Sequence, residues 1–520
     1  MTGFVVRKNE YHDSVFLMRV AKRLSEQKGV LRAAALMATE KNKILLAEMG
    51  IGGAEISAAA PSDLVVAIRA DSQQTVTAVL QNIDQWFYLE VGSGATSEVR
   101  TLEEALARQP RSNLALISVP GEYAAREARK ALEHGLNVFL FSDNVPLESE
   151  RSLKEFARER GLIVMGADCG TALIGGVGVG FANVVRPGPI GVIGASGTGI
   201  QEFTALVHRA GSGISHAIGT GSRDLSDAIG GISTLSALAA LESDAQTQVI
   251  AILSKPPGSL ALAHLFPRIN QCPKPIVTCF LGPQKAALAA NARSAVARTL
   301  EEAAALAVQI ATGSRPTGFT VDSPHIQGLI LKEQAGMKPG QKYIRGIFAG
   351  GTFCYQAQQV LREAGMGVHS NVPMEGNLKL PDPLRSLEHT LVDMGADEFT
   401  AGRPHPMIDA RLRCERIAAE AQDPQVAILL LDFILGFNAS PDPAGELARV
   451  VTGAKQAVKK RGGFLSVIAS VCGTEGDRQG LQHQVRLLEE EGVVVFPSSA
   501  QAALFCGRLA TRLQEGSHAA

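Results

Sequence analysis

The chain has 520 residues, of which 46% are hydrophobic and 19% charged, and its formal net charge at pH 7 is −1. This length and composition are typical of a globular protein with several domains, and the near-zero charge argues against nucleic acid or an anionic membrane as a partner. Aromatic residues make up only 5% while glycine reaches 53 residues, a balance typical of α/β layers joined by short turns.

The cysteines indicate a reducing environment. They are odd in number, scattered and without a C-x-x-C pair, which also argues against a zinc site, so we expect no bound metal. The first residues lack the apolar core of a signal peptide, and no run of about 18 apolar residues occurs. We therefore expect a cytoplasmic protein. The cysteines are Cys169, Cys272, Cys279, Cys354, Cys414, Cys472 and Cys506.

Strand and helix patterns alternate through the first 109 residues. Short apolar runs predict strands, and amphipathic stretches between them predict helices. Asp13 or Ser14 is the predicted N-cap of the first helix, with a contact to a ligand as the alternative. The predicted strands cover residues 4–7, 33–37 and 63–69, and the predicted helices cover 15–27, 41–49 and 101–109.

A loop with chemistry-bearing residues follows the next group of elements. Strands are predicted at 114–119, 137–141 and 162–165, with helices at 124–134 and 153–160. The last strand leads into Asp168, Cys169 and Gly170, at the carboxyl end where ligands of open α/β sheets bind, so we take these three as a ligand loop. No histidine lies near Cys169 in the sequence to act as its base, which favours packing over a nucleophilic role.

The strongest candidate site is a glycine-rich turn between a buried strand at 190–193 and a helix at 200–207. Free N–H groups of a first helical turn, with two hydroxyls, can hold phosphate or another oxyanion. The pattern is neither a P-loop nor a G-x-G-x-x-G fingerprint, so we expect no NAD. A turn that binds nothing is the alternative. The turn consists of Ser196, Gly197, Thr198 and Gly199.

A second turn of similar construction occurs in the other half of the chain. It follows a predicted strand at 343–348, opens a helix at 353–361 and contains Gly350, Gly351 and Thr352. In both halves a polar segment then leads into another apolar run, at 249–253 and at 426–431. We interpret this as one module that occurs twice, which would let two helix N-termini face a single anionic group.

Two cations follow predicted strands of the first module. Arg223 either clamps phosphate with two hydrogen bonds or pairs with Asp224, which can also cap the next helix. Lys255 stands at the carboxyl end of its strand, before two prolines that stop the strand. We predict a catalytic or ligand-binding role for both cations.

Another polar loop lies between prolines in the second module. His405 is a candidate proton donor or substrate contact, and Arg403 a further cation beside it, so both are predicted catalytic residues. The alternative is a helix-entry segment in which Asp409 caps a helix at 410–421.

Over nearly its whole length the chain resembles the FdrA/YahF-type proteins, which are fused acyl-CoA synthetase-like proteins. Residues 113 to about 282 resemble the α subunit of succinyl-CoA synthetase, and residues from about 343 to 508 resemble the ligase domain of its β subunit. The resemblance implies an α/β fold with a Rossmann-like CoA-binding-type domain followed by flavodoxin-like parallel-sheet ligase domains. The stretches that carry it are residues 141–145, 194–199, 254–257 and 402–409.

The resemblance also gives domain boundaries. We expect the Rossmann-like CoA-binding-type domain at 1–185, an α-like ligase domain at 186–315, a connector at 316–340 and a β-like ligase domain at 341–520.

Three departures separate this chain from succinyl-CoA synthetase. The phosphohistidine loop of that enzyme corresponds to residues 282–289, which contain no histidine, and the glutamate that pairs with this histidine corresponds to Lys255. No stretch matches an ATP-grasp domain. We therefore do not expect an acyl phosphate to be made here by a phosphohistidine relay.

The resemblance implies transfer of an acyl or carbamoyl group from its phosphate, with a small carboxylate as the other substrate, as in an oxamate carbamoyltransferase-like enzyme. Coenzyme A is the expected cofactor, and we expect a homo-oligomer, partner subunits, or both. The alternative is a scaffold subunit of a succinyl-CoA ligase-like complex that binds CoA or a metabolite and has lost the chemistry.

We predict that incubation with ATP radiolabelled at its γ-phosphate leaves no phosphohistidine on this protein, because residues 282–289 lack the acceptor. Stability of any protein-bound label in acid and base measures this, since phosphohistidine is labile in acid and stable in base. Label with that behaviour on any histidine of the chain would contradict the prediction.

Overall fold

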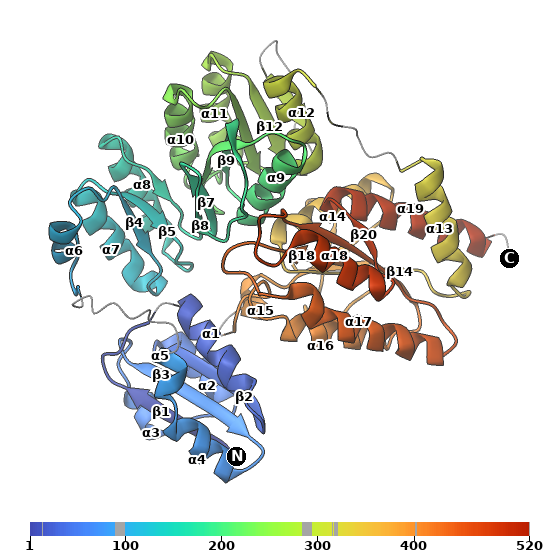
Figure 1. Cartoon of the computed structure of the whole chain (residues 1–520), viewed down its shortest axis with the longest axis horizontal. Coiled ribbons are helices and arrows are strands. Elements are labelled where there is room, and N and C mark those ends of the chain that lie inside the picture. The colour runs from blue at the N-terminus through green and yellow to red at the C-terminus, as the bar shows by residue number, and fades with distance from the viewer. Residues whose placement is uncertain are drawn as a thin grey trace. The chain divides into compact units, whose positions relative to one another are not determined.

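The computed structural model describes residues 1–12, 14–88, 99–282, 294–314, 316, 321–400 and 403–518. The chain forms two compact units, shown with their elements in Figure 1. The smaller unit consists of Met1–Ser112, Ser118–Pro120 and Asp397–Asp409, and the larger unit contains the rest. Among the described residues no helix is both long and apolar enough to cross a membrane.

The smaller unit is built on a three-stranded antiparallel sheet of order β1-β3-β2. The central strand is fully apolar apart from Arg69 and is buried, because helices and its two neighbours cover it. Leu17, Val20 and Leu24 form the apolar stripe of α1 that packs on this sheet. The elements are β1 (Thr2–Arg7), α1 (Ser14–Ser25), β2 (Val30–Met37), α2 (Glu40–Glu48), α3 (Ala54–Ala58), β3 (Leu64–Ala70), α4 (Gln73–Gln81), α5 (Asp84–Tyr88), α6 (Leu102–Arg108) and α15 (Asp397–Thr400).

This unit differs from the domain predicted at 1–185. Residues 1–112 carry their own antiparallel sheet, whereas the parallel Rossmann-like strands begin only at residue 114 and belong to the larger unit. Alternation of short strands and helices is common to both arrangements, so the pattern alone did not separate them. Asp13, one of the two proposed caps of α1, lies outside the described residues.

The larger unit begins with a small parallel sheet of order β4-β5-β6. Two amphipathic helices accompany it, and α7 packs on both β4 and β5. Its elements are β4 (Leu114–Ile117), α7 (Gly121–Glu133), β5 (Asn137–Leu140), α8 (Leu147–Glu159) and β6 (Val164–Met165).

A seven-stranded sheet of order β13-β12-β11-β9-β10-β7-β8 follows. Its strands from β9 to β13 are parallel, and the hairpin β7–β8 adds an antiparallel edge. Its elements are β7 (Thr171–Ile174), β8 (Val177–Gly180), β9 (Pro187–Gly194), α9 (Gly197–Arg209), β10 (Ile214–Gly219), α10 (Ile232–Ser243), β11 (Val249–Ser254), α11 (Ser259–Gln271), β12 (Ile276–Phe280), β13 (Ser294–Ala297) and α12 (Leu300–Thr312).

The second seven-stranded sheet is parallel throughout and has the order β16-β15-β17-β14-β18-β19-β20. The predicted connector contributes a helix, α13, rather than only irregular chain. The elements are α13 (Pro324–Gly336), β14 (Tyr343–Phe348), α14 (Gly351–Glu363), β15 (His369–Ser370), β16 (Leu378–Lys379), β17 (Thr390–Asp393), α16 (Arg411–Glu420), β18 (Val426–Ile434), α17 (Pro443–Lys460), β19 (Ser466–Cys472), α18 (Leu481–Glu490), β20 (Val494–Phe496) and α19 (Ser499–His518).

Five parallel strands of the two large sheets follow the same order, which confirms the predicted duplication. In the first sheet β9 lies between β10 and β11, with β12 and β13 beyond β11; in the second, β14 lies between β17 and β18, with β19 and β20 beyond β18. The apolar runs noticed in the sequence are therefore the equivalent strands β11 and β18. The glycine-rich turns precede the equivalent helices α9 and α14.

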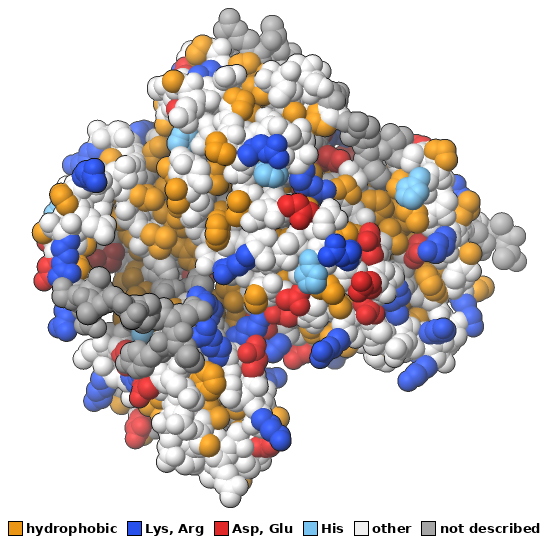
Figure 2. All heavy atoms as spheres, in the orientation of Figure 1, with side chains coloured by type: hydrophobic (Ala, Val, Ile, Leu, Met, Phe, Trp, Pro, Cys, Tyr) orange, Lys and Arg blue, Asp and Glu red, His pale blue; other side chains and the backbone are white. Residues whose placement is uncertain are grey.

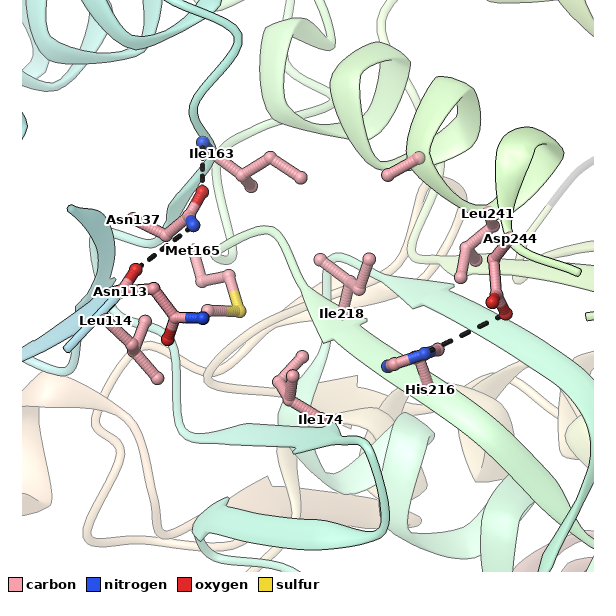
Figure 3. Close-up of a pocket in the computed structure, with 11 residues that line it drawn as sticks. Asn113, Leu114, Asn137, Ile163, Met165, Ile174, His216, Ile218, Leu241 and Asp244 are labelled. Carbon is pink, nitrogen blue, oxygen red and sulfur yellow. Dashed lines mark hydrogen bonds and ion pairs between the residues drawn. The ribbon is translucent and has the colours of Figure 1, made fainter. Parts of the chain in front are cut away.

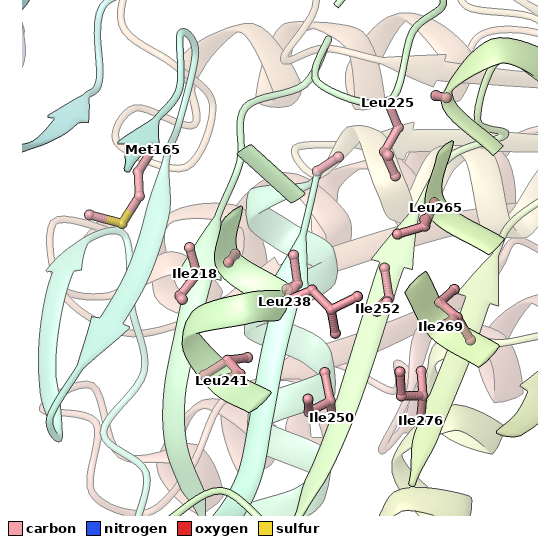
Figure 4. Packing of buried hydrophobic residues seen from close by; sticks show 14 of the residues in the cluster. Met165, Ile218, Leu225, Leu238, Leu241, Ile250, Ile252, Leu265, Ile269 and Ile276 are labelled. Carbon is pink, nitrogen blue, oxygen red and sulfur yellow. The ribbon is translucent and has the colours of Figure 1, made fainter. Parts of the chain in front are cut away.

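The core explains why these strands are apolar along their whole length. Parallel strands covered by helices on both faces have no solvent-facing side, so alternation is lost. One face of the first large sheet packs against α10 and α11, where Leu238, Leu241, Leu265 and Ile269 meet strand residues including Ile252 (Figure 4).

The two modules cap each other's last helix. Glu202 of α9 accepts hydrogen bonds from the Ser499 N–H (2.6 Å) and hydroxyl (2.8 Å) at the start of α19. Gln356, at the equivalent place in α14, accepts one from the N–H of Leu300 at the start of α12 (2.8 Å). One capping group is thus a carboxyl and the other an amide. Burial raises the pKa of Glu202 from 4.5 to about 7.

We predict that Glu202→Gln makes the protein more stable at pH 8 and changes stability little at pH 5. A raised carboxyl pKa means that the folded state holds its proton more tightly than the unfolded chain, so wild-type stability falls as the pH rises from about 4.5 to about 7. The glutamine keeps the acceptor oxygen and removes this fall, worth roughly 3 kcal/mol. Melting temperatures measured across this pH range test it.

Gln356→Glu is the matched control, because it introduces a buried carboxyl at the equivalent position. It should lower the melting temperature at pH 8 more than at pH 5. A stability difference between wild type and Glu202→Gln that does not vary with pH would contradict the role given to Glu202.

Candidate functional site

The first glycine-rich turn forms the N-terminus of α9. Ser196 is the N-cap, and its hydroxyl accepts the N–H of Gly199 at 3.1 Å. The hydroxyl of Thr171 lies beside this turn, 3.0 Å from where a Cβ at Gly197 would stand. It is buried and has no hydrogen-bond partner among the described residues. An unsatisfied buried hydroxyl next to a helix N-terminus is typical of a site that completes itself with a ligand or water.

The second turn forms the N-terminus of α14, but part of it is already occupied. The carboxylate of Asp432, at 0% exposure, accepts the N–H groups of Ala349 (2.8 Å) and Gly350 (2.7 Å) and pairs with Arg413 at 2.8 Å. Burial raises the pKa of Asp432, and Arg413 opposes that rise. Gly350 was predicted to bind the phosphate or acyl group, and its N–H donates instead to Asp432 in this structure.

The two turns meet. The hydroxyls of Ser196 and Thr352 are hydrogen-bonded, which joins the N-terminal ends of α9 and α14. In the described part of the chain, the N–H groups of Gly197, Thr198, Gly351 and Thr352 have no acceptor, whereas that of Gly199 is bound by Ser196. Four free first-turn donors on two touching helix ends are well suited to an oxyanion.

The positive potential is not equal on the two sides. A Cβ at position 351 would collide with the carboxylate of Asp393, so a negative group lies next to the start of α14. Asp432 is paired with Arg413, and Asp393 accepts the Gly395 N–H at 2.9 Å. A carboxylate so close to the first turn of α14 weakens the attraction of that helix end for an anion.

Lys255 supplies a cation at the same edge of the first large sheet. It follows β11, whose Leu253 pairs with Gly194 of β9, so Lys255 and Ser196 each lie two residues beyond that pair. Its ammonium stands 5.8 Å from the ring centre of Tyr355 on α14. Burial raises the pKa of Tyr355 to about 12, so this ring is neutral. No ion pair to Lys255 is found among the described residues.

Arg223 is held in a structural ion pair, though not with the predicted partner. It binds Glu150 at 2.7 Å and the carbonyl of Val145 at 2.8 Å. Asp224 instead pairs with the buried Lys154 at 2.8 Å and accepts the first-turn N–H groups at the start of α10. The expectation that Asp224 caps the next helix is confirmed, and the geometry favours the structural alternative for Arg223.

The loop that contains Asp168, Cys169 and Gly170 has a packing role for its thiol. Cys169 is buried, and burial raises its pKa to about 12, so the thiol stays protonated at neutral pH and is a poor nucleophile. Asp168 is exposed and accepts the hydroxyl of Ser222 at 2.7 Å. Gly170 immediately precedes Thr171, whose buried hydroxyl has no hydrogen-bond partner among the described residues.

Arg403 and His405 belong to the smaller unit, whereas both helix N-termini belong wholly to the larger one. Arg403 is exposed, and His405 accepts the Met407 N–H on Nδ1 at 3.2 Å, so its neutral ring carries the proton on Nε2. The proposed cap Asp409 was wrong: the N-cap of α16 is Ala410, and no side chain caps that helix.

Arg413 is the residue of this region that the sequence did not reveal. It lies within a helix of ordinary amphipathic appearance, and its partner Asp432 lies in the following strand, beyond the reach of any helical spacing, so no local pattern identified the pair.

Three family models match the chain. The one described as CoA binding domain matches residues 185–271, the one described as CoA-ligase matches residues 347–509, and the one described as AllF, heavy metal-associated domain, matches residues 1–103. The first glycine-rich turn thus lies in the CoA-binding match and the second in the CoA-ligase match. The CoA-binding match begins at 185, where we had predicted a ligase domain to begin.

The fold and these matches define a protein of the CoA-ligase superfamily. The chain is 41% identical over 501 residues, 96% of its length and 97% of the relative's, to a protein of Escherichia coli K12 called uncharacterized protein YahF. The chain belongs to the FdrA/YahF succinyl-CoA synthetase-like family.

Two more distant relatives match only part of the chain. It is 26% identical to the alpha subunit of an ADP-forming succinate–CoA ligase of Methanothermobacter thermautotrophicus, over 34% of this chain and 60% of that subunit. It is 29% identical to a malate–CoA ligase subunit alpha of Methylorubrum extorquens, over 30% of this chain and 53% of that subunit.

The residues of the smaller unit do not fit the metal that the name of its family model implies. Residues 1–103 contain no cysteine, and the described residues include no group of three histidine, cysteine or acidic side chains placed to hold an ion. Soft metals require such ligands.

We predict that Arg223→Ala lowers stability and leaves the affinity for inorganic phosphate unchanged. The substitution removes one of the two cations from the buried Glu150, which should cost about 1–3 kcal/mol. Thermal unfolding and isothermal titration with phosphate measure the two effects. If the variant loses phosphate affinity without losing stability, Arg223 contacts the ligand and the structural role is wrong.

Proposed function

We propose that the chain binds an acyl or carbamoyl phosphate at the joined N-termini of α9 and α14, as a group-transfer enzyme or as a subunit of one. The observation that carries this is the set of four unpartnered N–H groups on two helix ends joined by Ser196 and Thr352. Lys255 adds a full charge to the two partial charges, each equivalent to about half an elementary charge.

The chemistry follows from where negative charge develops. A nucleophile, either the thiolate of coenzyme A or the amide nitrogen of an oxamate-like carboxylate, attacks the acyl or carbamoyl carbon. The new bond forms there, the C–O bond to phosphate breaks, and phosphate leaves with the electron pair; when the nucleophile is nitrogen, phosphate also takes up its proton. N–H donors fixed around the phosphate oxygens stabilise the charge that grows on this leaving group. They also hold the phosphate in place so that the neighbouring carbonyl carbon stays within reach of the nucleophile.

Coenzyme A is the acceptor best supported by the comparisons, because the match described as CoA binding domain covers the first turn and the named relatives are CoA ligase subunits. Carbamoyl transfer with an oxamate-like acceptor rests on the family resemblance alone. Because we expect no ATP-grasp domain in this chain, the phosphorylated donor would come from a partner subunit or from solution.

One observation favours a second function. Residues 282–289 contain no histidine. By the resemblance to succinyl-CoA synthetase, Lys255 also stands where that enzyme has the glutamate that pairs with its phosphohistidine. A scaffold that binds CoA and performs no transfer would show the same losses.

We predict that Lys255→Ala weakens binding of acetyl phosphate and carbamoyl phosphate by about tenfold or more, because one charge-assisted contact is worth about 1.5–3 kcal/mol. Isothermal titration measures this. Lys460→Ala is the matched control: it removes the same charge from the exposed end of α17, at the opposite edge of its sheet from the turns. It should bind like wild type.

Two results would decide against the proposal. If the wild-type protein binds neither acetyl phosphate nor carbamoyl phosphate, the proposed anion site is wrong. If Lys255→Ala binds them as tightly as wild type, Lys255 is not part of the site. Binding of CoA without any turnover of acetyl phosphate or carbamoyl phosphate would favour the scaffold.

A further inference from the structure

The larger unit contains a cavity of about 250 Å³ that none of the predicted site residues lines. It lies between the small sheet β4-β5-β6 on one side and β7, β10 and the end of α10 on the other (Figure 3). Asp244 follows α10 and precedes β11, which places it at the amino edge of the first large sheet. Ser196 follows the carboxyl end of β9, so the cavity and the helix N-termini are at opposite edges.

Most of the cavity wall is apolar. Leu114, Ile163 and Met165 contribute from the small sheet, and Ile174 and Ile218 from the large one (Figure 3). Hydrophobic side chains also gather at the surface around β7 and β8, where Val177 is 66% exposed (Figure 2). An apolar cavity of roughly 150 Å³ holds benzene, so this one has room for a ring with a substituent.

One end of the cavity is polar: His216 and Asp244 face each other there without forming a direct hydrogen bond. Nε2 of His216 and Oδ2 of Asp244 are 3.8 Å apart, beyond a hydrogen bond. Nδ1 of His216 accepts the N–H of Gly175 at 3.1 Å, so the neutral ring carries its proton on Nε2. A group that enters the gap must accept a hydrogen bond from His216 and can donate one to Asp244.

The charge of this end excludes an anion. The hydroxyl of Thr247 donates to Asp244 at 2.6 Å and lowers its pKa, so the carboxylate is charged at neutral pH. Lys274, a cation at this end, already donates to the backbone carbonyls of Leu241 and Asp244. A carboxylate or phosphate would meet Asp244 without a free cation. An ammonium would satisfy Asp244 but place its N–H against the N–H of His216.

A hydroxyl meets both requirements, because it accepts and donates at the same oxygen. The opposite wall offers a further polar group, because the side chain of Asn113 makes no hydrogen bond to the residues that the structure describes. That of Asn137 is used by the Ile163 N–H and the Asn113 carbonyl. Few polar groups at fixed places in an apolar cavity are typical of a small-molecule site.

We infer that this cavity is a second ligand site, which takes a small uncharged molecule with an apolar ring or chain and a hydroxyl that bridges His216 and Asp244. It lies away from the proposed phosphate site and binds a different chemical class. Its occupant is an alcohol or phenol rather than a CoA or phosphate compound.

The test compares four probes with one ring and different head groups: benzyl alcohol, toluene, benzoate and benzylamine. Ligand-observed NMR titration of the full chain should show benzyl alcohol binding about tenfold or more tighter than toluene, as expected for one net hydrogen bond or two, with benzoate weakest. Equal affinity for benzyl alcohol and toluene, or tightest binding of benzoate or benzylamine, would overturn the inference.

Two variants locate the binding. His216→Phe keeps the ring shape, removes the donor and should abolish the advantage of benzyl alcohol over toluene. Ile174→Trp fills the cavity and should abolish both, with Ala240→Trp at the rim as the second choice if the first does not fold. Binding of benzyl alcohol that survives a folded cavity-filling variant would place it elsewhere and overturn the assignment.

Discussion

Two helix N-termini that touch repel each other, because each carries a partial positive charge of the same sign. In this protein α9 and α14 are brought end to end, and the arrangement of the larger unit depends on how that repulsion is offset. The hydroxyls of Ser196 and Thr352 bridge the two ends, and the carboxylate of Asp432, itself held by Arg413, fills the donors on one side. The remaining donors are left without a partner. An anion bound there would neutralise the partial positive charge that the protein's own groups leave uncompensated.

The duplicated modules are alike in topology and different in charge. Glu202 and Gln356 occupy equivalent positions and perform the same capping task, yet one is a carboxyl and the other an amide. The carboxylates of Asp393 and Asp432, from β17 and β18, lie against the turn before α14, whereas Lys255 follows a strand of the first module. Symmetry of the fold therefore does not give symmetry of the site, and a bound anion would be held mainly by the first module.

Much of this fold could be predicted because its signals are local. The buried strands β9, β11, β14 and β18 are uninterrupted apolar runs, and both glycine-rich turns were identified from the residues that form them. The antiparallel sheet at 1–112 was missed, since short alternating elements do not reveal strand direction. The partners of Arg223 and Gly350 could not be predicted either, because Glu150 and Asp432 are distant in sequence and their contacts exist only after folding. Residues 283–293 and 317–320, which include the loop without histidine, lie outside the described residues.

The smaller unit is discontinuous, since residues 397–409 from the second module complete the fold that begins with residues 1–112. Lys22 of α1 donates to the carbonyl of Ile408 at 3.4 Å, so the two segments touch. A domain joined by a single linker can be removed or exchanged as one continuous segment. The smaller unit cannot, because it consists of three separate segments of the chain. Cutting the chain after residue 112 would leave the first fragment without residues 397–409 and the second with a segment that packs in the other unit, so such a cut would not release the smaller unit intact.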